Sequence, residues 1–251
     1  MNKTVISWTD ATWNPTHGCT RVSEGCRNCY AERLSRQKGF TSLPWTKANE
    51  ARNILLKPHK LREPYGLKTP SRIFVNSMSD LFHPLIPEDY LQRIFAVMAD
   101  CPHHTFQVLT KRPERAITWH LWPVNVWLGV SIENAQTVHR LATLRTIPAS
   151  TRFLSCEPLL GPLALGDLSG IHWVIVGGES GPAFRPMAHG WAAHIKDACV
   201  AQGVAFFFKQ SAAARTERGT SLQEADGQFY RWAQYPGSLD PPQQTAPHRY
   251  A

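Results

Sequence analysis

The feature that most constrains the fold of this chain is a series of short apolar runs, each of which ends in polar residues. Six of these runs are rich in β-branched and aromatic residues, and they begin at Arg72, Thr105, Val126, Arg152, Trp173 and Val204. Apolar residues that follow one another without alternation indicate strands buried on both faces, as in a parallel sheet. The stretch VISWTD, residues 5–10, is a further candidate strand.

Helical patterns separate several of these runs. The pattern over residues 87–101 opens with Pro87 and two acidic residues, and the patterns over 134–148 and 190–203 stop at Pro148 and Gly203. Parallel strands that alternate with helices are joined by right-handed crossovers. We therefore predict an α/β fold, a partial (β/α) TIM-like barrel of about six to seven mostly parallel strands. A doubly wound open sheet is the alternative.

Domain boundaries follow from composition. Residues 164–170, ALGDLSG, are too few and too rich in glycine for a helix, so we expect a loop or a short extra strand. We predict one barrel domain over residues 1–235. Residues 236–251 are rich in Pro and Gln, which predicts a disordered tail.

Composition narrows the class of protein and its partners. The chain has 251 residues and a formal net charge of +8, which favours a polyanionic partner such as nucleic acid over a merely basic soluble protein. Trp13, Trp45 and Trp119 are candidates for base stacking, although such residues more often fill a core. No apolar run is long enough for a membrane span and the start lacks an apolar signal core, so we expect a cytoplasmic protein without membrane contact.

Three of the six cysteines lie close together, in the spacing C-x6-C-x2-C formed by Cys19, Cys26 and Cys29. Thiols in the cytoplasm are kept reduced, which favours a metal site over disulfides. Structural zinc takes four ligands, and the candidates for the fourth are His17, Cys101, Cys156 and Cys199. A [4Fe–4S] cluster held by three thiolates keeps one iron open for a substrate or cofactor. Three incidental thiols are the remaining interpretation.

The three-cysteine loop resembles that of radical S-adenosylmethionine (SAM) enzymes. In those enzymes three cysteines after the first barrel strand bind a [4Fe–4S] cluster, SAM chelates the open iron, and an external electron donor starts the reaction. Tyr30, beside the last cysteine, and the helical pattern over residues 30–37 are similar. Their usual spacing is C-x3-C-x2-C, so the first gap here is three residues longer. The resemblance implies that Cys19, Cys26 and Cys29 are the cluster ligands.

A longer set of motifs resembles a phage-associated three-cysteine-motif family of unknown function, itself similar to radical SAM proteins. The motifs are WNPTHGCTRVSEGCRNCYAE, FVNSMSDLFH, LTKRP, GVSIEN, FLSCEPLLGPL, VIVGGESG and FFKQ, in that order between Trp8 and Gln210. This resemblance implies a radical-SAM-like barrel and a cluster, and it implies no substrate.

Polar residues at the carboxyl ends of the apolar runs are the candidate site residues, because the loops there build the active site of a barrel. The candidates for binding SAM are Asn76, Ser77, Ser79, Ser131, Glu133, Gly177, Gly178 and Glu179. The candidates for catalysis are Cys156, as a hydrogen-atom donor, Glu157 and Lys111. Polar residues are also expected where strands reach the surface, and free cysteine is often only a small buried residue.

Together these features predict a radical-SAM-like enzyme that modifies or repairs nucleic acid or a nucleotide. Its cofactors are a [4Fe–4S] cluster and SAM, and a partner protein stays unidentified. The alternative is a non-catalytic nucleic-acid-binding protein stabilised by zinc or by a cluster.

Overall fold

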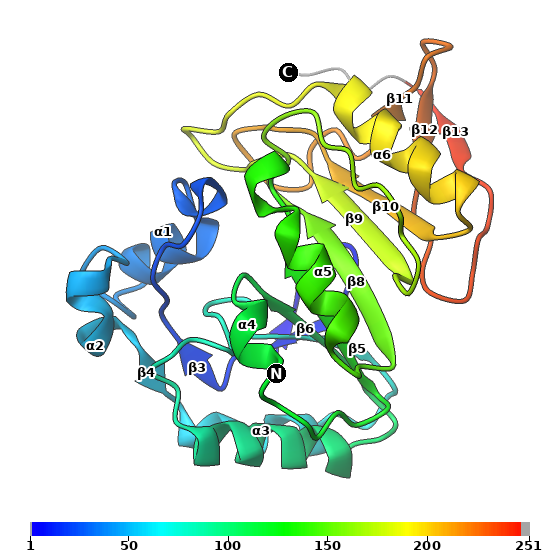
Figure 1. Ribbon diagram of the computed structural model, residues 1–251. Helices are drawn as coiled ribbons and strands as arrows, with labels where there is room; N and C mark the ends of the chain where they lie inside the picture. The colour runs from blue at the N-terminus through cyan, green and yellow to red at the C-terminus, as the bar shows by residue number, and fades with distance from the viewer. Residues whose placement is uncertain (1, 247–251) are drawn as a thin grey trace. The chain divides into compact units, whose positions relative to one another are not determined.

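The computed structural model describes residues 2–246, which divide into two compact units. The first unit comprises the chain up to Val130 together with residues 146–150, and the second comprises residues 131–145 and those from Thr151 onward. Each unit is a layer of parallel strands with helices beside it (Figure 1). The single barrel domain over residues 1–235 stays a prediction.

The first unit carries five strands in the order β1-β2-β5-β6-β7. These are β1 (Asn2–Lys3), β2 (Ala11–Trp13), β5 (Arg72–Val75), β6 (Thr105–Thr110) and β7 (Val126–Ser131), whose last residue begins the second unit. All neighbours pair in parallel except β1, which is antiparallel to β2. The predicted strand at residues 5–10 is wrong, because those residues precede β2 as turns and bends.

Helices and short turns fill the connections of the first unit. The short strands β3 (Thr16–His17) and β4 (Leu55–Leu56) pair antiparallel. The main helix of the first unit is α3 (Glu88–Asp100). The others are α1 (Tyr30–Gln37), α2 (Glu50–Asn53), α4 (Pro113–Ala116) and the 3-10 turns η1 (Glu24–Cys26), η2 (Lys47–Asn49), η3 (Pro58–Lys60) and η4 (Glu63–Gly66). The apolar face of α3, from Tyr90 to Met98, is buried, as the spacing of its apolar residues predicts.

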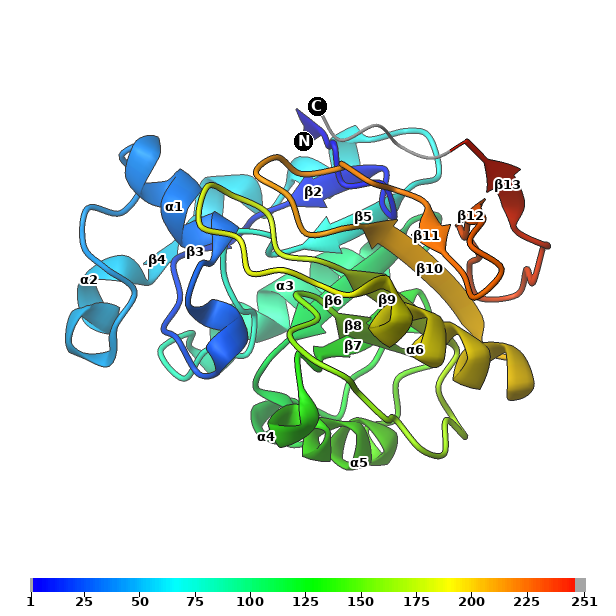
Figure 2. The same ribbon diagram turned by 90° about the horizontal axis from the view of Figure 1, so that it is seen from above.

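The second unit carries three parallel strands in the order β8-β9-β10, which are β8 (Thr151–Cys156), β9 (Trp173–Gly177) and β10 (Ala205–Gln210). Its helical segments are η5 (Ala135–Thr137), α5 (His139–Thr146) and α6 (His189–Ala201), and α6 lies beside β9 and β10 (Figure 2). Every residue of β9 is buried, which explains its unbroken apolar sequence. Residues 164–170 form a loop.

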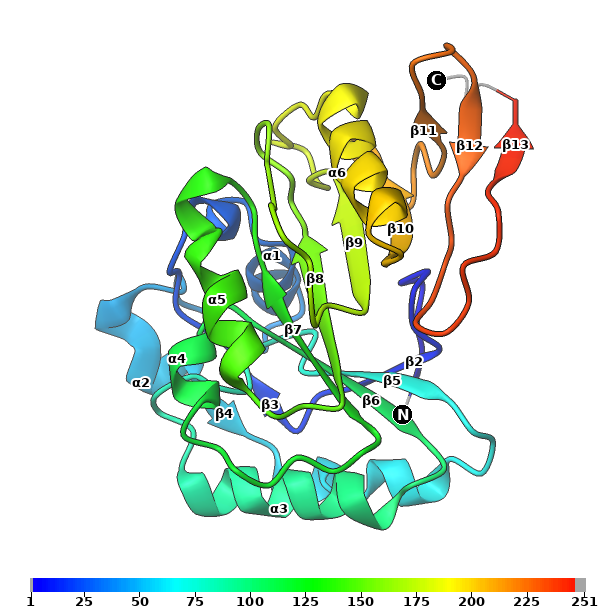
Figure 3. The same cartoon turned by 45° about the vertical axis from the view of Figure 1, so that its right-hand side comes forward.

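A small antiparallel sheet completes the second unit (Figure 3). It consists of β11 (Leu222–Gln223), β12 (Phe229–Arg231) and β13 (Gln243–Thr245). Strand β13 lies within the segment for which the sequence predicts disorder, and its backbone pairs with β12 at three positions. Residues 247–251 of that predicted tail lie outside the described residues.

Seven strands of the two units thus pair in parallel, β2 and β5 to β10. The fold class is mixed α/β, consistent with the predicted partial β/α barrel. Among residues 2–246, no helix combines the length and the apolar character that crossing a bilayer requires. Trp13, Trp45 and Trp119 have at most 7% of their surface exposed, so they pack inside the first unit and are not platforms for bases.

Candidate functional site

The three cysteines lie on one connection of the first unit, between β3 and α1. Cys19 follows the β3 strand, Cys26 ends the turn η1, and Cys29 is the residue that precedes α1. Gly18 starts this loop with a φ of +86°, and its backbone N–H donates to the carbonyl of Met78 at 3.0 Å. The loop is therefore tied, at its first residue, to the segment that follows β5.

An ion pair between the exposed Arg21 and the buried Glu32 holds the loop against α1. The Arg21 guanidinium donates to both oxygens of the Glu32 carboxylate, at 3.0 and 2.9 Å. Glu32 has only 5% of its surface exposed, and its Oε1 also accepts from the backbone N–H of Trp45 at 3.0 Å. Bidentate Arg–carboxylate pairs fix orientation as well as charge, so the turn between Cys19 and Cys29 has a defined path.

Burial makes the thiols of this loop costly to ionise. Burial and the nearby Asp80 carboxylate raise the pKa of Cys19 to about 12, against the opposing effect of Arg112. Burial also raises the pKa of Cys29, while the backbone N–H groups of Glu32 and Ala31 and the Lys111 ammonium act in the opposite direction. These thiols remain protonated at neutral pH unless a metal replaces the proton.

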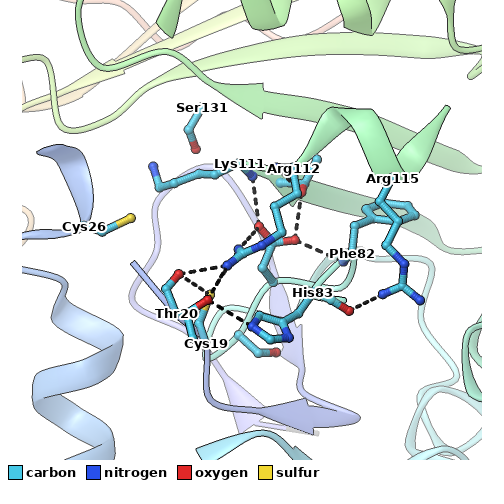
Figure 4. A network of polar contacts seen from close by, with 12 residues as sticks. Cys19, Thr20, Cys26, Phe82, His83, Lys111, Arg112, Arg115 and Ser131 are labelled. Carbon is cyan, nitrogen blue, oxygen red and sulfur yellow. Dashed lines mark hydrogen bonds and ion pairs between the residues drawn. The ribbon is translucent and has the colours of Figure 1, made fainter. Parts of the chain in front are cut away.

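Arg112 connects Cys19 to the residues that follow β5 and β6 (Figure 4). One guanidinium nitrogen, Nη1, donates to Cys19 Sγ at 3.4 Å and to Asp80 Oδ2 at 3.2 Å. The other, Nη2, donates to the backbone carbonyl of Thr20 at 2.9 Å and to its hydroxyl at 2.7 Å. Arg112 is 9% exposed, so this pairing takes place in a largely dehydrated environment.

The residues after β5, predicted to bind SAM, have two different roles in the structure. The Ser77 hydroxyl bonds the Asn14 side chain at 3.1–3.2 Å, and the Ser79 hydroxyl bonds Thr16 Oγ1 at 2.7 Å. These two serines therefore join the segment after β5 to the segment after β2. Asn76 is 2% exposed, has a φ of +62°, and neither polar atom of its side chain has a hydrogen-bond partner among the described residues.

Lys111, predicted to be catalytic, directly precedes Arg112. Its backbone N–H donates to Asp80 Oδ2 at 3.0 Å, and its ammonium is close enough to Cys29 to lower the pKa of that thiol. Lys111 therefore belongs to the surroundings of the three cysteines.

The second unit contains the other predicted site residues, and several of them pair with one another. Glu133 is fully buried, and its Oε2 accepts from Arg140 Nη1 at 3.0 Å; the same nitrogen donates to the backbone carbonyl of Ser131 at 2.7 Å. Arg185 binds both oxygens of Glu179 at 2.6 to 3.1 Å. Removing the arginine from either pair would leave a buried carboxylate without its counter-ion, which is costly.

Glu157 and Lys209 lie 3.4 Å apart, after β8 and near the end of β10. Gly177 lies against this pair, because a Cβ atom there would approach Glu157 Oε1 to 2.7 Å. Gly178 packs against main chain, because its Cβ would lie 2.2 Å from the backbone nitrogen of Ala212. Both glycines of the GGESG motif thus permit close packing, as expected of glycine beside a backbone or ligand.

Cys156 is fully buried at the end of β8, and burial together with the nearby Cys199 raises its pKa well above the usual value. This is the placement of a packing thiol. Cys101 and Cys199 are also buried, beside α3 and within α6.

Among residues 2–246, no group of three or more His, Cys, Asp or Glu side chains is arranged around a single metal ion. A [4Fe–4S] cluster makes a different demand, because each thiolate binds a different iron of the cube and the sulfurs stay well separated. A cluster bound here would need donors or positive charge near its thiolates to neutralise them.

Two residues of this site, Thr20 and His83, were not candidates from the sequence, and Asp80 and Arg112 were distinguished only as polar residues that follow apolar runs. Asp80 and His83 lie within the FVNSMSDLFH motif, and Thr20 directly follows Cys19. The sequence signal for Asp80 was its position after a buried strand. In the structure its Oδ1 accepts a hydrogen bond from the backbone N–H of Phe82 at 3.0 Å. Nothing local marked Thr20 or His83, which meet through a 3.0 Å hydrogen bond between residues 63 positions apart.

A family model described as "Protein of unknown function (DUF5131)" covers residues 3–236. No curated protein matches the chain significantly, and no solved structure does.

Proposed function

We propose that this chain, which belongs to the DUF5131 family, binds a [4Fe–4S] cluster through Cys19, Cys26 and Cys29 and is a radical-SAM-like enzyme. The phage association and the substrate class, nucleic acid or a nucleotide, are part of the same proposal. The observation that supports it most is the hydrogen bond from the Arg112 guanidinium to Cys19 Sγ. Donors of this kind surround metal-bound thiolates, because they neutralise charge that burial would otherwise disfavour.

The donors around Cys29 support the same assignment. The backbone N–H groups of Ala31 and Glu32, in the first turn of an eight-residue helix, act to lower the pKa of the Cys29 thiol, against the larger effect of burial. The positive end of the helix dipole stabilises an anion there. Cys19 and Cys29 thus each have a source of positive potential nearby, which is Arg112 for Cys19 and the start of α1 for Cys29. A thiol that is buried only for packing does not need such a source.

With a cluster bound, the chemistry supplied is the reductive cleavage of SAM to a 5′-deoxyadenosyl radical. The chain contributes the ligands, a dry environment and the orientation of the bound molecules. Cys26 and Arg112 are buried, at 8% and 9% exposure, which limits the access of water to this side of the site.

Asn76 is the residue best suited to bind SAM among those predicted. Its carboxamide is buried and carries one unpaired donor group and one unpaired acceptor, which is rare unless a ligand or water satisfies them. Its positive φ stores strain of the kind found at binding sites. The amide oxygen suits the SAM ammonium group, and the amide N–H suits its carboxylate.

The charge of the chain supports a polyanionic substrate. Exposed basic residues of the first unit include Lys47, Arg52, His59, Arg62 and Lys68. Such side chains bind phosphates as point charges without reading sequence.

The test is anaerobic reconstitution with iron and sulfide, followed by reduction with dithionite in the presence of SAM. We expect about four irons and four sulfides per chain, a broad visible absorption band, and 5′-deoxyadenosine. Replacing Cys19, Cys26 or Cys29 by alanine should abolish all three signals. Cys101→Ala and Cys199→Ala are matched controls that should retain them, since both residues are buried elsewhere.

Other outcomes separate the alternatives. One tightly held zinc per chain after anaerobic purification, with neither iron nor SAM binding, refutes the proposal and supports the non-catalytic nucleic-acid-binding protein. A cluster that neither binds nor cleaves SAM refutes the enzymatic part alone.

A further inference from the structure

In the cysteine loop, the sulfur of Cys19 accepts a hydrogen bond from a charged side chain. The donor is Arg112, 93 positions away in the sequence. Cys26 instead lies 3.7 Å from the Ser23 hydroxyl. One corner of a bound cluster would therefore face a fixed positive charge.

Asp80 fixes the guanidinium from one side. Its Oδ1 accepts from Thr110 Oγ1 at 2.7 Å and from the backbone N–H of Phe82 at 3.0 Å. Its Oδ2 accepts from the backbone N–H of Lys111 at 3.0 Å and from Arg112 Nη1 at 3.2 Å. With four donors, and only 5% of its surface exposed, this carboxylate has little freedom to move.

Thr20 and His83 fix the guanidinium from the other side. The His83 Nδ1 accepts from the backbone N–H of Leu85 at 3.2 Å, so in the neutral ring the proton lies on Nε2. That nitrogen donates to Thr20 Oγ1 at 3.0 Å, and the same hydroxyl accepts from Arg112 Nη2 at 2.7 Å. The fork of Arg112 is thus held at Asp80 and at Thr20, with one N–H directed at the Cys19 sulfur (Figure 4).

We propose that Arg112 is a positioning residue that sets the reduction potential of the cluster through its directed hydrogen bond to Cys19. This inference rests on the proposed function. A cluster gains an electron on reduction, so a fixed N–H and positive charge at a ligand sulfur stabilise the reduced state more than the oxidised state. Arg112 therefore raises the potential and eases electron entry from the external donor.

The geometry of arginine matters here, and charge alone does not replace it. A guanidinium has five N–H donors in a rigid plane, which lets it contact Asp80, Thr20 and Cys19 at once. A lysine ammonium has a single flexible nitrogen and cannot keep the same fixed set of contacts. A lysine at position 112 should keep part of the effect, and an uncharged residue should lose it.

The experiment is a spectroelectrochemical titration of the reconstituted full chain, with Arg112→Lys and Arg112→Gln compared with wild type. At the wild-type midpoint we expect the ratio of oxidised to reduced cluster to rise at least tenfold in Arg112→Gln. For a one-electron couple this is a shift of about 59 mV to more negative potential. Arg112→Lys should fall between the two, with a rise of about threefold.

Arg115→Gln is the matched control. It removes the same charge from the same region, and the Arg115 guanidinium contacts the carbonyls of His83 and Ile86 instead of a cysteine. We expect its ratio to change less than about twofold. Iron content and circular dichroism of each variant show whether the cluster and the fold are retained.

Three outcomes overturn the inference. An equal shift in Arg112→Gln and Arg115→Gln would show that only net charge matters. An unchanged potential in Arg112→Lys and Arg112→Gln would show that the hydrogen bond has no electronic effect. Loss of the cluster in both Arg112 variants, while Arg115→Gln keeps it, would leave Arg112 a purely structural residue. Absence of a cluster from wild type is distinguishable from these results, because it refutes the proposed function and the inference with it.

Discussion

Gly18 is the residue of the cysteine loop that we expect to tolerate substitution least. Its φ is +86°, in the left-handed region that L side chains rarely adopt. An added Cβ would lie 1.9 Å from the backbone oxygen of Asn53 and 2.6 Å from its carbonyl carbon. These are main-chain atoms at the end of α2 and cannot turn aside as a side chain can. Gly18→Ala must therefore move the backbone of one segment or the other.

The size of the effect follows from two costs. A left-handed conformation costs an L residue about 1–2 kcal/mol. Forcing extra volume into a packed site costs about 1–3 kcal/mol more, so we expect Gly18→Ala to lower the free energy of unfolding by roughly 2–5 kcal/mol. Displacement of Asn53 also disturbs its 2.9 Å hydrogen bond to the Pro44 carbonyl and the pairing of His17 with Leu55.

Gly39→Ala is a control matched in conformation. Gly39 has a φ of +68°, and a Cβ there would meet no atom within 4 Å. It should therefore show only the conformational cost of about 1–2 kcal/mol. The difference between the two variants, about 1–3 kcal/mol, isolates the steric clash.

The assay is urea unfolding followed by tryptophan fluorescence, together with iron content after reconstitution. Gly18→Ala should lose stability and most of its iron, because Cys19 moves with the loop. Gly39→Ala should retain its iron. Equal destabilisation of the two variants, or full iron content in Gly18→Ala, would refute the close contact between the loop and α2.

Two further predictions concern charges buried inside the units. In Arg140→Met, the fully buried Glu133 loses the guanidinium that lies 3.0 Å away, and we expect a loss of about 3–5 kcal/mol in urea unfolding; an unchanged midpoint would contradict this pairing. Burial, followed by Arg112, lowers the pKa of His83 to about 4 from 6.5. As pH falls, His83 is therefore protonated in the unfolded chain at a higher pH than in the folded chain. The free energy of unfolding should fall by up to about 3 kcal/mol as pH drops from 6.5 to 4. His83→Gln should lack this part of the pH dependence, and an identical slope in both proteins would contradict it.

The elements that sequence predicts well are those whose signals are local. Pro87 and the acidic residues after it mark the start of α3, and its apolar spacing marks the buried face. The runs from Arg72 to Ala205 became strands because unbroken apolar sequence has few other stable placements. The first strand was misplaced, because residues 11–13 are only three residues long and too short for a periodic pattern.

The candidate site was predictable only in part, for a related reason. The short spacing of the three cysteines is a local signal, and it identified their shared loop. The contacts around them join residues far apart in the sequence, such as Thr20 with His83 and Asp80 with Arg112. No composition or spacing rule pairs residues across such separations, so the surroundings of Cys19 became visible only in the folded chain.

The same contacts reduce the number of residues available to a ligand in the first unit. Polar residues at strand ends have two possible uses, which are to bind a ligand or to join neighbouring loops. Ser77 and Ser79 serve the second use, since their hydroxyls bond the segment after β2. Asn76 serves neither within the described residues, although its buried amide needs partners as much as any polar group. It follows that the binding of a small, polar ligand should depend on Asn76 more than on either serine. The test is to compare the SAM affinity of the variants Asn76→Ala, Ser77→Ala and Ser79→Ala. An Asn76→Ala protein that binds SAM as tightly as wild type would remove the basis for that ranking.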